Sequence, residues 1–341
     1  MARRFTIADI AAAAGVSKGA VSYALNGRPG VSDATRARIL AIAAEMGFVR
    51  NRAARSLSVA SAQAVGIALR RSARTLGIEP YFMELISGIE ATLSAASFGL
   101  TLQIVDSLDA ELEVYRRWWA ERRVDGILLC DIGVDDPRLD RVADLGLPAV
   151  AVGGPVQGAR LPAVWHDDAE PCRDVLEYLH ALGHRRIARV AGLPHLLHTA
   201  IRDRAYAETA AGLGFASVTT VHCDYTGEES ARVTRRLLTA PGRPTAIVFD
   251  NDVMAVAGLG VAHELGIAVP GGLSIVAWDD SPLCRLTHPA LTSLTRDITA
   301  YGAQCAQALL AVIGAEPERH AAVRCRPAEL SPRGSTGPPR T

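Results

Sequence analysis

A serine between two glycines is the first residue whose spacing indicates chemistry. Residues 15–19 read Gly-Val-Ser-Lys-Gly, which matches the G-x-S-x-G pattern that presents a nucleophilic serine in many hydrolases. That role needs a buried strand before the serine and a helix after it. Residues 7–14 instead carry apolar side chains at helical spacing. We therefore interpret Ser17 as a helix N-cap, with a hydrolase as the minor alternative.

Other residues that could hold a metal or a cofactor lack the spacing to do so. His195 and His198 form a single H-x-x-H pair, and Gly258 and Gly260 lack the third glycine of a dinucleotide fingerprint. No C-x-x-C pair occurs among the six cysteines, which we expect to be reduced and buried: Cys130, Cys172, Cys223, Cys284, Cys305 and Cys325. We expect no metal, no cofactor and no catalytic residue, so the chain should not be an enzyme.

The elements around Ser17 predict a DNA-binding head. Helices are expected at 7–14, 18–26 and 33–46, with a tight turn at Gly15 between the first two. Two short helices joined in this way, with a third as a brace, form a helix-turn-helix whose second helix enters the major groove. Lys can donate to guanine and Ala can contact the methyl of thymine. The predicted contacts are Thr6, Ser17, Lys18, Gly19, Ala20, Ser22, Tyr23 and Asn26.

The distribution of charge agrees with a DNA contact at this end of the chain. The whole chain has 36 basic and 36 acidic side chains, but residues 1–60 hold nine basic and three acidic ones, a net charge of 9 − 3 = +6. The remainder then has 27 basic and 33 acidic residues, a net charge of −6. A basic head on an acidic body favours nucleic acid as the partner of the head.

From residue 64 onward, short apolar runs alternate with amphipathic stretches. The predicted strands are 64–69, 100–105, 126–130, 149–154, 186–191, 217–222, 245–250 and 273–278. Strands that alternate with helices indicate parallel sheets covered on both faces. No apolar run reaches the roughly 20 residues that span a bilayer, and Asp9 interrupts any signal peptide, so we expect a cytoplasmic protein.

The motifs along the chain resemble those of the lactose-repressor (LacI) family of bacterial transcription regulators. They are TIADIAAAAGVSKGAVSYALNG at 6–27, VDGILL at 124–129, LGHRRIA at 182–188, WDDSPL at 278–283, PALTSL at 289–294 and RGST at 333–336. The resemblance implies a small all-α helix-turn-helix head plus an α/β body. The body would consist of two doubly wound parallel-sheet subdomains of periplasmic-binding-protein type. We expect domains at 1–49 (head), 50–63 (hinge helix and linker) and 64–330 (effector binding and dimerisation), with a disordered tail at 331–341.

The resemblance also implies further site residues. Asn51, Arg52, Ala54, Arg55 and Leu57 match the family's hinge helix, in which the leucine wedges into the minor groove. Positions that match effector contacts are Leu69, Arg70, Arg202, Tyr225, Asn251 and Asp279. Ala277 and Trp278 depart from the residues usual before that last aspartate, so the identity of the effector stays open.

These features together predict a homodimeric transcriptional regulator that binds a pseudo-palindromic operator in double-stranded DNA. The predicted effector is a small molecule, a sugar or a related metabolite, and no membrane partner is expected. A repressor is the main interpretation and an activator the alternative; whether the effector is an inducer or a corepressor stays open. A transport sugar-binding protein would share the fold of the body, but it would carry a signal peptide and no basic head.

Overall fold

A computed structural model describes residues 5–48, 61–71, 76–155, 158, 160–314 and 322–340. The chain divides into two units, residues 1–61 and 62–341, and each is described by itself. In the first unit, α1 (Ile7–Ala14), α2 (Lys18–Leu25) and α3 (Asp33–Glu45) enclose a small core. Ile10, Val21 and Ile39, one from each helix, are fully buried in it. These three short helices therefore fold around one shared apolar centre.

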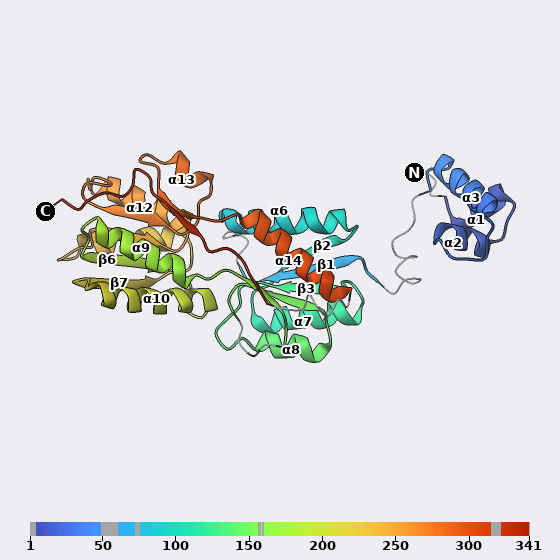
Figure 1. The fold of residues 1–341 in the computed structure, drawn as a ribbon, viewed down its shortest axis with the longest axis horizontal. Helices are drawn as coiled ribbons and strands as arrows, with labels where there is room; N and C mark the ends of the chain where they lie inside the picture. Colours follow the sequence, from blue (N-terminus) through green and yellow to red (C-terminus); the bar gives the residue numbers. More distant parts are fainter. Residues whose placement is uncertain are drawn as a thin grey trace. The chain divides into compact units, whose positions relative to one another are not determined.

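The second unit contains two α/β lobes, which we call the first and second lobe. The first lobe has a parallel sheet in the order β11-β5-β4-β3-β1-β2, with helices on both faces (Figure 1). Its strands are β1 (Ala64–Leu69), β2 (Gly99–Ile104), β3 (Gly126–Leu129), β4 (Ala149–Val152), β5 (Ala163–Trp165) and β11 (Val323–Arg324). Its helices are α6 (Pro80–Ala95), α7 (Leu108–Ala120), α8 (Pro137–Leu145) and α14 (Ile298–Ile313).

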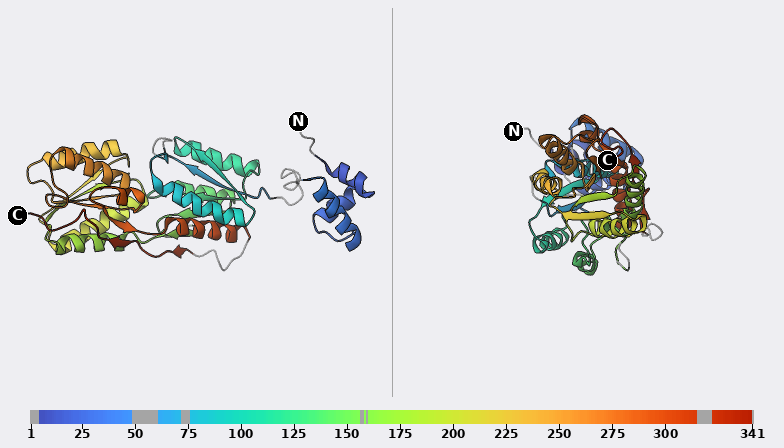
Figure 2. Two further views of the ribbon diagram at one scale, coloured as in Figure 1. Left: turned by 90° about the horizontal axis from the view of Figure 1, so that it is seen from above. Right: turned by 90° about the vertical axis from the view of Figure 1, so that its left-hand side faces the viewer.

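The second lobe repeats this architecture, as a second view also shows (Figure 2). Its sheet has the order β12-β10-β9-β8-β6-β7, in which only the pairing of β12 with β10 is antiparallel. The strands are β6 (Arg186–Ala191), β7 (Ser217–His222), β8 (Ala246–Phe249), β9 (Ser274–Ala277), β10 (Thr292–Thr295) and β12 (Glu329–Ser331). The helices are α9 (Ala169–Ala181), α10 (Leu197–Leu213), α11 (Gly227–Thr239), α12 (Asp252–Glu264) and α13 (Pro282–Leu286).

Burial in the central strands explains why they read as continuous apolar runs. Every residue of β3, β4, β8 and β9 is buried, because helices cover both faces of each sheet. On one face of the first lobe, α6 and α14 approach closely enough to need glycines. A Cβ added at Gly88 would lie 1.9 Å from the carbonyl oxygen of Thr299, and one at Gly302 would lie 2.2 Å from that of Leu85.

Three segments connect the two lobes. The chain passes from β5 to α9 through residues 166–168, from β10 back to α14 through 296–297, and from β11 to β12 through 325–328. Because α14 belongs to the first lobe, each lobe contains stretches that are distant in sequence. This arrangement places the carboxyl ends of both sets of parallel strands at the junction of the lobes, where ligands of open α/β sheets bind.

The expectation of a disordered tail is wrong for the described residues of that segment. β12 reaches Ser331, and Ser335 is fully buried, with its Oγ accepting from the backbone N–H of Thr292 and donating to the carbonyl of Ile275. The side chain of Arg333 forms an ion pair with Asp280 at 2.7 Å. The Pro/Gly/Ser-rich composition indicated disorder, but these side chains form hydrogen bonds and an ion pair with residues in or next to β9 and β10.

Candidate functional site: a recognition helix and an interlobe cleft

The turn before α2 is fixed by capping contacts on both sides. Thr6 and Asp9 form a reciprocal capping box at the start of α1, and Gly15 ends that helix in the left-handed region at φ 64°. The Oγ of Ser17 accepts from the backbone N–H of Ala20 at 3.1 Å. Because the segment before Ser17 is a helix and its hydroxyl caps α2, the structure confirms a helix-turn-helix and not a nucleophile elbow.

The outer side of α2 carries the residues that the sequence predicts to contact DNA. Lys18 and Gly19 are exposed in its first turn, and the ring of Tyr23, 45% exposed, lies one turn further on. The amide of Asn26 donates to the Oγ of Ser22 at 3.3 Å. Thr6 is exposed and Ala20 is partly buried. The predicted hinge contacts Asn51, Arg52, Ala54, Arg55 and Leu57 lie outside the described residues.

A cavity of about 760 Å³, including its open mouth, lies between the two lobes. Residues from the first lobe, the second lobe and the connecting segments all contribute to its wall. The charged and aromatic ones are Arg71, Glu79, Tyr81, Phe82, Asp131, His166, Asp168, His198, Arg202, Tyr225, Asp250, Asp279, Arg296 and Tyr301.

Each of the three arginines in this wall is paired with a carboxylate. Two nitrogens of Arg71 donate to Asp131, at 2.8 and 3.0 Å. Arg202 donates to Asp168 at 3.2 Å, and Arg296 donates to Asp279 at 3.1 Å. An aromatic ring also lies against each guanidinium: Tyr225 for Arg71, Trp278 for Arg202 and Tyr81 for Arg296. The positive charges are therefore neutralised within the protein.

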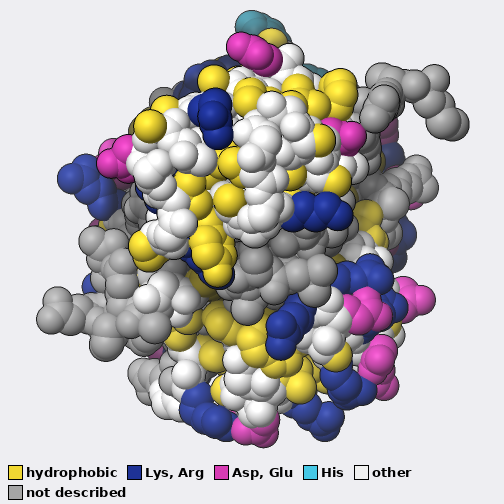
Figure 3. Space-filling model, turned by 90° about the vertical axis from the view of Figure 1, so that its right-hand side faces the viewer, with side chains coloured by type: hydrophobic (Ala, Val, Ile, Leu, Met, Phe, Trp, Pro, Cys, Tyr) yellow, Lys and Arg dark blue, Asp and Glu magenta, His cyan; other side chains and the backbone are white. Residues whose placement is uncertain are grey.

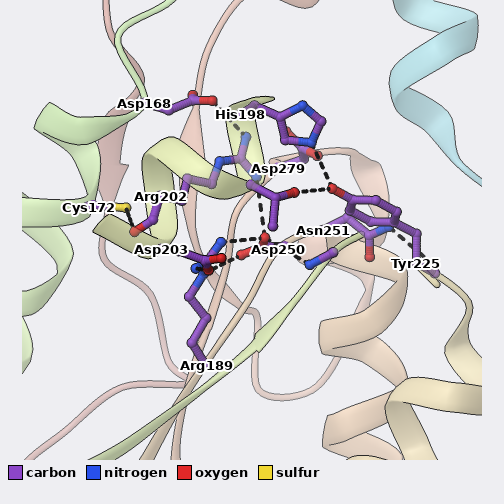
Figure 4. Close-up of polar contacts among 12 residues, drawn as sticks. Asp168, Cys172, Arg189, His198, Arg202, Asp203, Tyr225, Asp250, Asn251 and Asp279 are labelled. Carbon is purple, nitrogen blue, oxygen red and sulfur yellow. Dashed lines mark hydrogen bonds and ion pairs between the residues drawn. The ribbon is translucent and has the colours of Figure 1, made fainter. Parts of the chain in front are cut away.

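Asp250 links the cavity to a buried ionic network in the second lobe (Figure 4). Its carboxylate accepts from Arg189 at 2.8 and 2.7 Å and from the backbone N–H of Gly192 at 3.0 Å, and it lies 3.8 Å from Arg202. Arg189 is fully buried and also donates to Asp203 at 2.5 Å. The surrounding cations keep the pKa of Asp250 below its usual value despite its burial. This aspartate therefore stays ionised beneath the ligand space.

Tyr225 is held at the edge of the cavity by its hydroxyl group. The hydroxyl lies 2.7 Å from Nε2 of His198 and 3.2 Å from the Oγ1 of Thr199. A side chain at Gly192 would collide with this phenol, because an added Cβ would lie 1.9 Å from its Cζ atom. Burial, reinforced by the positive charge of Arg202, lowers the pKa of His198 to about 4, so this imidazole is neutral at physiological pH.

The structure places most, but not all, of the predicted effector residues in this cleft. Arg202, Tyr225 and Asp279 line the cavity. Asn251 lies directly beneath it: its Oδ1 caps α12 by accepting from Met254, and its Nδ2 donates to the carbonyl of Tyr225 at 3.4 Å. The predictions for Leu69 and Arg70 are wrong. Leu69 faces the first-lobe core and is 1% exposed, while Arg70 pairs with Glu111 at 2.7 Å.

Arg71, the next residue along, takes the position in the cavity that we assigned to Arg70. The sequence reasoning also missed Glu79, His166 and Arg296. A usable signal existed for His166 and Arg296, because each directly follows a short uncharged run that contains β-branched residues, at 163–165 and 292–295. These runs were too short to be recognised as strands.

Comparison with known proteins identifies both units. The model for bacterial regulatory proteins of the lacI family matches residues 6–51, and the model for a periplasmic binding protein-like domain matches residues 176–336. The transcriptional regulator CelR of Thermobifida fusca is 31% identical over 312 residues, which cover 90% of this chain and 92% of that protein.

Solved structures agree in fold with the described residues. A LacI family regulator from Bifidobacterium animalis superimposes with a TM-score of 0.75 at 36% identity, covering 82% of this chain and 100% of that one. A complex of the regulator CelR with cellobiose superimposes with a TM-score of 0.72 at 28% identity, covering 97% and 100%. The CelR complex thus covers nearly the whole chain, and the Bifidobacterium regulator covers about four fifths of it. The chain belongs to the LacI family of bacterial regulatory proteins, which are helix-turn-helix transcriptional regulators.

Proposed function

We propose that this protein is a homodimeric repressor whose affinity for a pseudo-palindromic operator is controlled by a neutral carbohydrate bound in the interlobe cleft. The pairing of every cavity arginine with a carboxylate is the observation that carries the ligand class. Five carboxylate residues and three guanidinium groups border the cavity, and each guanidinium group is already paired with a carboxylate, so an anionic effector would meet net negative charge. Carboxylates and guanidinium groups side by side suit the hydroxyl groups of a sugar, which both donate and accept.

The likeness to CelR, which has been solved with cellobiose, supports the same class of ligand. Trp278, Tyr225 and Tyr81 already lie against the cavity arginines, which keeps the aromatic surface close to the ligand space. We infer that a neutral glucoside is the first compound to test. The cleft would serve to bind this ligand and not to transform it, so we propose no enzymatic activity.

On the DNA side, we propose that α2 enters the major groove with Lys18 and Tyr23 toward base edges and Gly19 allowing close approach. Arg52, Arg55 and Leu57 would belong to a hinge segment at 50–63 that contacts the minor groove at the operator centre. Such a protein would act in the cytoplasm, where chromosomal DNA is found. No helix among the described residues is long and apolar enough to cross a membrane.

Exposed apolar residues on edge strands support the dimer. β2 is an edge strand of the first sheet, and its Leu102 and Ile104 are 45% and 47% exposed. In the second lobe, Val218 on the edge strand β7 and Leu286 on α13 are also exposed. On the face drawn in Figure 3, hydrophobic side chains lie interspersed with Lys and Arg side chains. A second copy of the chain would cover these edges.

The ligand class is tested by thermal melting of the full-length protein with matched neutral and anionic sugars. Cellobiose, maltose and glucose form the neutral set, and glucuronate and glucose 6-phosphate form the anionic set. A ligand that binds only the folded protein raises Tm as its concentration rises. We expect a rise with at least one neutral sugar and none with the anionic set. A rise only with the anionic sugars would refute the neutral ligand.

A further inference from the structure

One carboxylate in the cleft is buried without a partner for one of its oxygens. Glu79 lines the cavity and is 7% exposed. Its Oε1 accepts a long hydrogen bond, 3.5 Å, from Asn251 of the second lobe, but its Oε2 has no hydrogen-bond partner among the described residues. Glu79 occupies the N-cap position of α6, yet its side chain makes no capping hydrogen bond. The carboxylate therefore does not cap the helix, and it forms no ion pair with a residue that the structure describes.

A second acceptor in the same cavity is the imidazole of His166. Its Nδ1 lies 2.7 Å from the carbonyl oxygen of Arg326, and a carbonyl can only accept, so Nδ1 carries the proton. Burial and the nearby Arg296 lower the pKa of His166 to about 4, which keeps the ring neutral. Nε2 is then a lone-pair acceptor, and it too is buried without a partner in the described part of the chain.

We propose that Glu79 Oε2 and His166 Nε2 are the two acceptors that bind hydroxyl groups of the effector and thereby determine its specificity. A buried polar atom without a hydrogen-bond partner destabilises the protein. A hydroxyl group of the ligand that donates to such an atom would remove this cost. The inference rests on the proposed function and deepens it, because it states which atoms read a neutral polyhydroxylated ligand.

The groups around Glu79 favour a hydroxyl over an ion. Arg71 lowers the pKa of Glu79 while Asp131 and Asp279 raise it, and burial has the largest effect, so that the pKa rises to about 7. A cation would meet the guanidinium groups of the same wall, and an anion would meet its carboxylates. A hydroxyl donates a proton to each acceptor without adding charge to the cavity.

His166 would also connect the ligand to two of the segments that join the lobes and to the helix that follows the other segment. His166 lies in the first connecting segment, 166–168, and its Nδ1–H donates to a backbone carbonyl of the third connecting segment, 325–328. Its ring is tilted by 52° relative to that of Tyr301, and the two ring centroids are 4.4 Å apart. Tyr301 lies one turn into α14, after the second segment, 296–297. A ligand hydroxyl on Nε2 would therefore bind where the lobes move relative to each other.

Isothermal titration calorimetry of the full-length protein with cellobiose, maltose and glucose tests this assignment. In Glu79→Gln, the affinity of the best-binding sugar should fall about tenfold to hundredfold, because a hydrogen bond to a charged acceptor is lost. His166→Phe keeps an aromatic ring beside Tyr301 but removes Nε2 together with the Nδ1–H bond to Arg326, and should cause a similar loss. The matched control is Glu90→Gln on an exposed position of α6, which should bind as the wild type does.

Two further readouts separate ligand binding from a structural role. Glu79→Gln removes a buried unpartnered charge, so the ligand-free variant should melt at a higher temperature than the wild type at pH 8, although it binds sugar less tightly. Wild-type affinity should increase from pH 6 to pH 8, because a donating hydroxyl favours the ionised carboxylate, and this dependence should disappear in Glu79→Gln.

The outcomes distinguish the two proposals. If the wild type binds a neutral sugar and Glu79→Gln binds it equally well at both pH values, the acceptor assignment is refuted while the proposed function stands. If Glu79→Gln loses affinity but also melts at a lower temperature than the wild type, Glu79 is a structural residue and the assignment is again refuted. If no neutral sugar binds the wild type, the ligand class of the proposed function is wrong, and the hydroxyl acceptors are refuted with it.

Discussion

The guanidinium carbon of Arg71 lies 4.8 Å from the ring centroid of Tyr225, and the two residues belong to different lobes. Arg71 follows β1 of the first lobe, and Tyr225 follows β7 of the second. The pair therefore forms a direct contact across the effector cleft. A cation–π contact of this kind stabilises the arrangement of the lobes by roughly 0.5–2 kcal/mol.

Removing the ring of Tyr225 should weaken effector binding. In Tyr225→Leu the contact with Arg71 is lost, and the affinity of a bound neutral sugar should fall by about threefold to thirtyfold. Tyr225→Phe is the control: it keeps the ring over Arg71 and loses only the bonds to His198 and Thr199. Calorimetric titration of the two variants provides the comparison. Equal losses in the two variants would mean that the hydroxyl, which both variants lack, and not the ring, closes the cleft.

Lys18 should read a base and should be shielded by DNA. It is the only lysine in the chain, so amine acetylation modifies Lys18 and the N-terminus alone. Lys18→Ala should relax base preference at one operator position, by about 1–3 kcal/mol for the preferred base. Operator DNA should protect Lys18 from acetylation in a mass-spectrometric footprint. Equal acetylation with and without DNA would remove Lys18 from the interface.

Asp279→Asn should abolish most of the effector response while leaving operator affinity intact. Asp279 accepts from Arg296 at 3.1 Å and lines the cavity. The amide cannot neutralise the guanidinium, so Arg296 would gain free positive charge in the ligand space. Anisotropy of a labelled operator duplex, titrated with the sugar that binds the wild type, measures the response. An unchanged sugar midpoint would place the effector elsewhere.

Acid should destabilise the cleft through His198. Its pKa is about 4 in the folded protein and about 6.5 in the unfolded chain, so its contribution to stability is present above pH 6.5 and is lost as the pH falls toward 4. The difference in the free energy of unfolding between the wild type and His198→Gln should therefore shrink by about 2 kcal/mol when the pH falls from 7 to 5. Urea unfolding at both pH values measures this difference. A gap that does not depend on pH would show that folding does not lower the pKa of His198.

Ser335→Ala should destabilise the body. Its hydroxyl bonds two backbone groups of β9 and β10 and is fully buried. Leaving them unsatisfied costs about 1–3 kcal/mol. Urea unfolding provides the test, with Ser94→Ala on an exposed face of α6 as the control. Equal stability of the two variants would mean that the tail contributes nothing to the fold.

The fold was predictable where periodicity was long enough to read. The eight strands that we expected correspond to β1, β2, β3, β4, β6, β7, β8 and β9, and the three head helices begin and end within about a residue of their predicted bounds. The four strands that we missed, β5, β10, β11 and β12, contain two to four residues. Such short runs carry too few residues to show a period, and their pairing is set by contacts distant in sequence.

The cleft was predictable only in part for a related reason. Arg202 lies in α10, and Tyr225 and Asp279 follow β7 and β9, so the resemblance to a known family located all three residues. Whether Arg70 or Arg71 points into the cavity depends on how the chain turns after β1, and the sequence pattern does not show the direction of that turn. Glu79 looks like an ordinary helix start, and only its missing capping bond sets it apart. The order of the tail depends on buried partners in β9 and β10 that its composition does not reveal.

The central claim is that a neutral sugar in the cleft controls sequence-specific DNA binding by the head. The most direct measurement begins with the full-length protein selecting duplexes from a random DNA library at fixed, stated salt, with and without the neutral sugars. The affinity of the enriched duplex is then titrated against each sugar. We expect an enriched palindrome whose affinity changes at least tenfold with one neutral sugar. Enrichment of no sequence under any condition, or a palindrome whose affinity responds only to an anionic sugar, would contradict the claim.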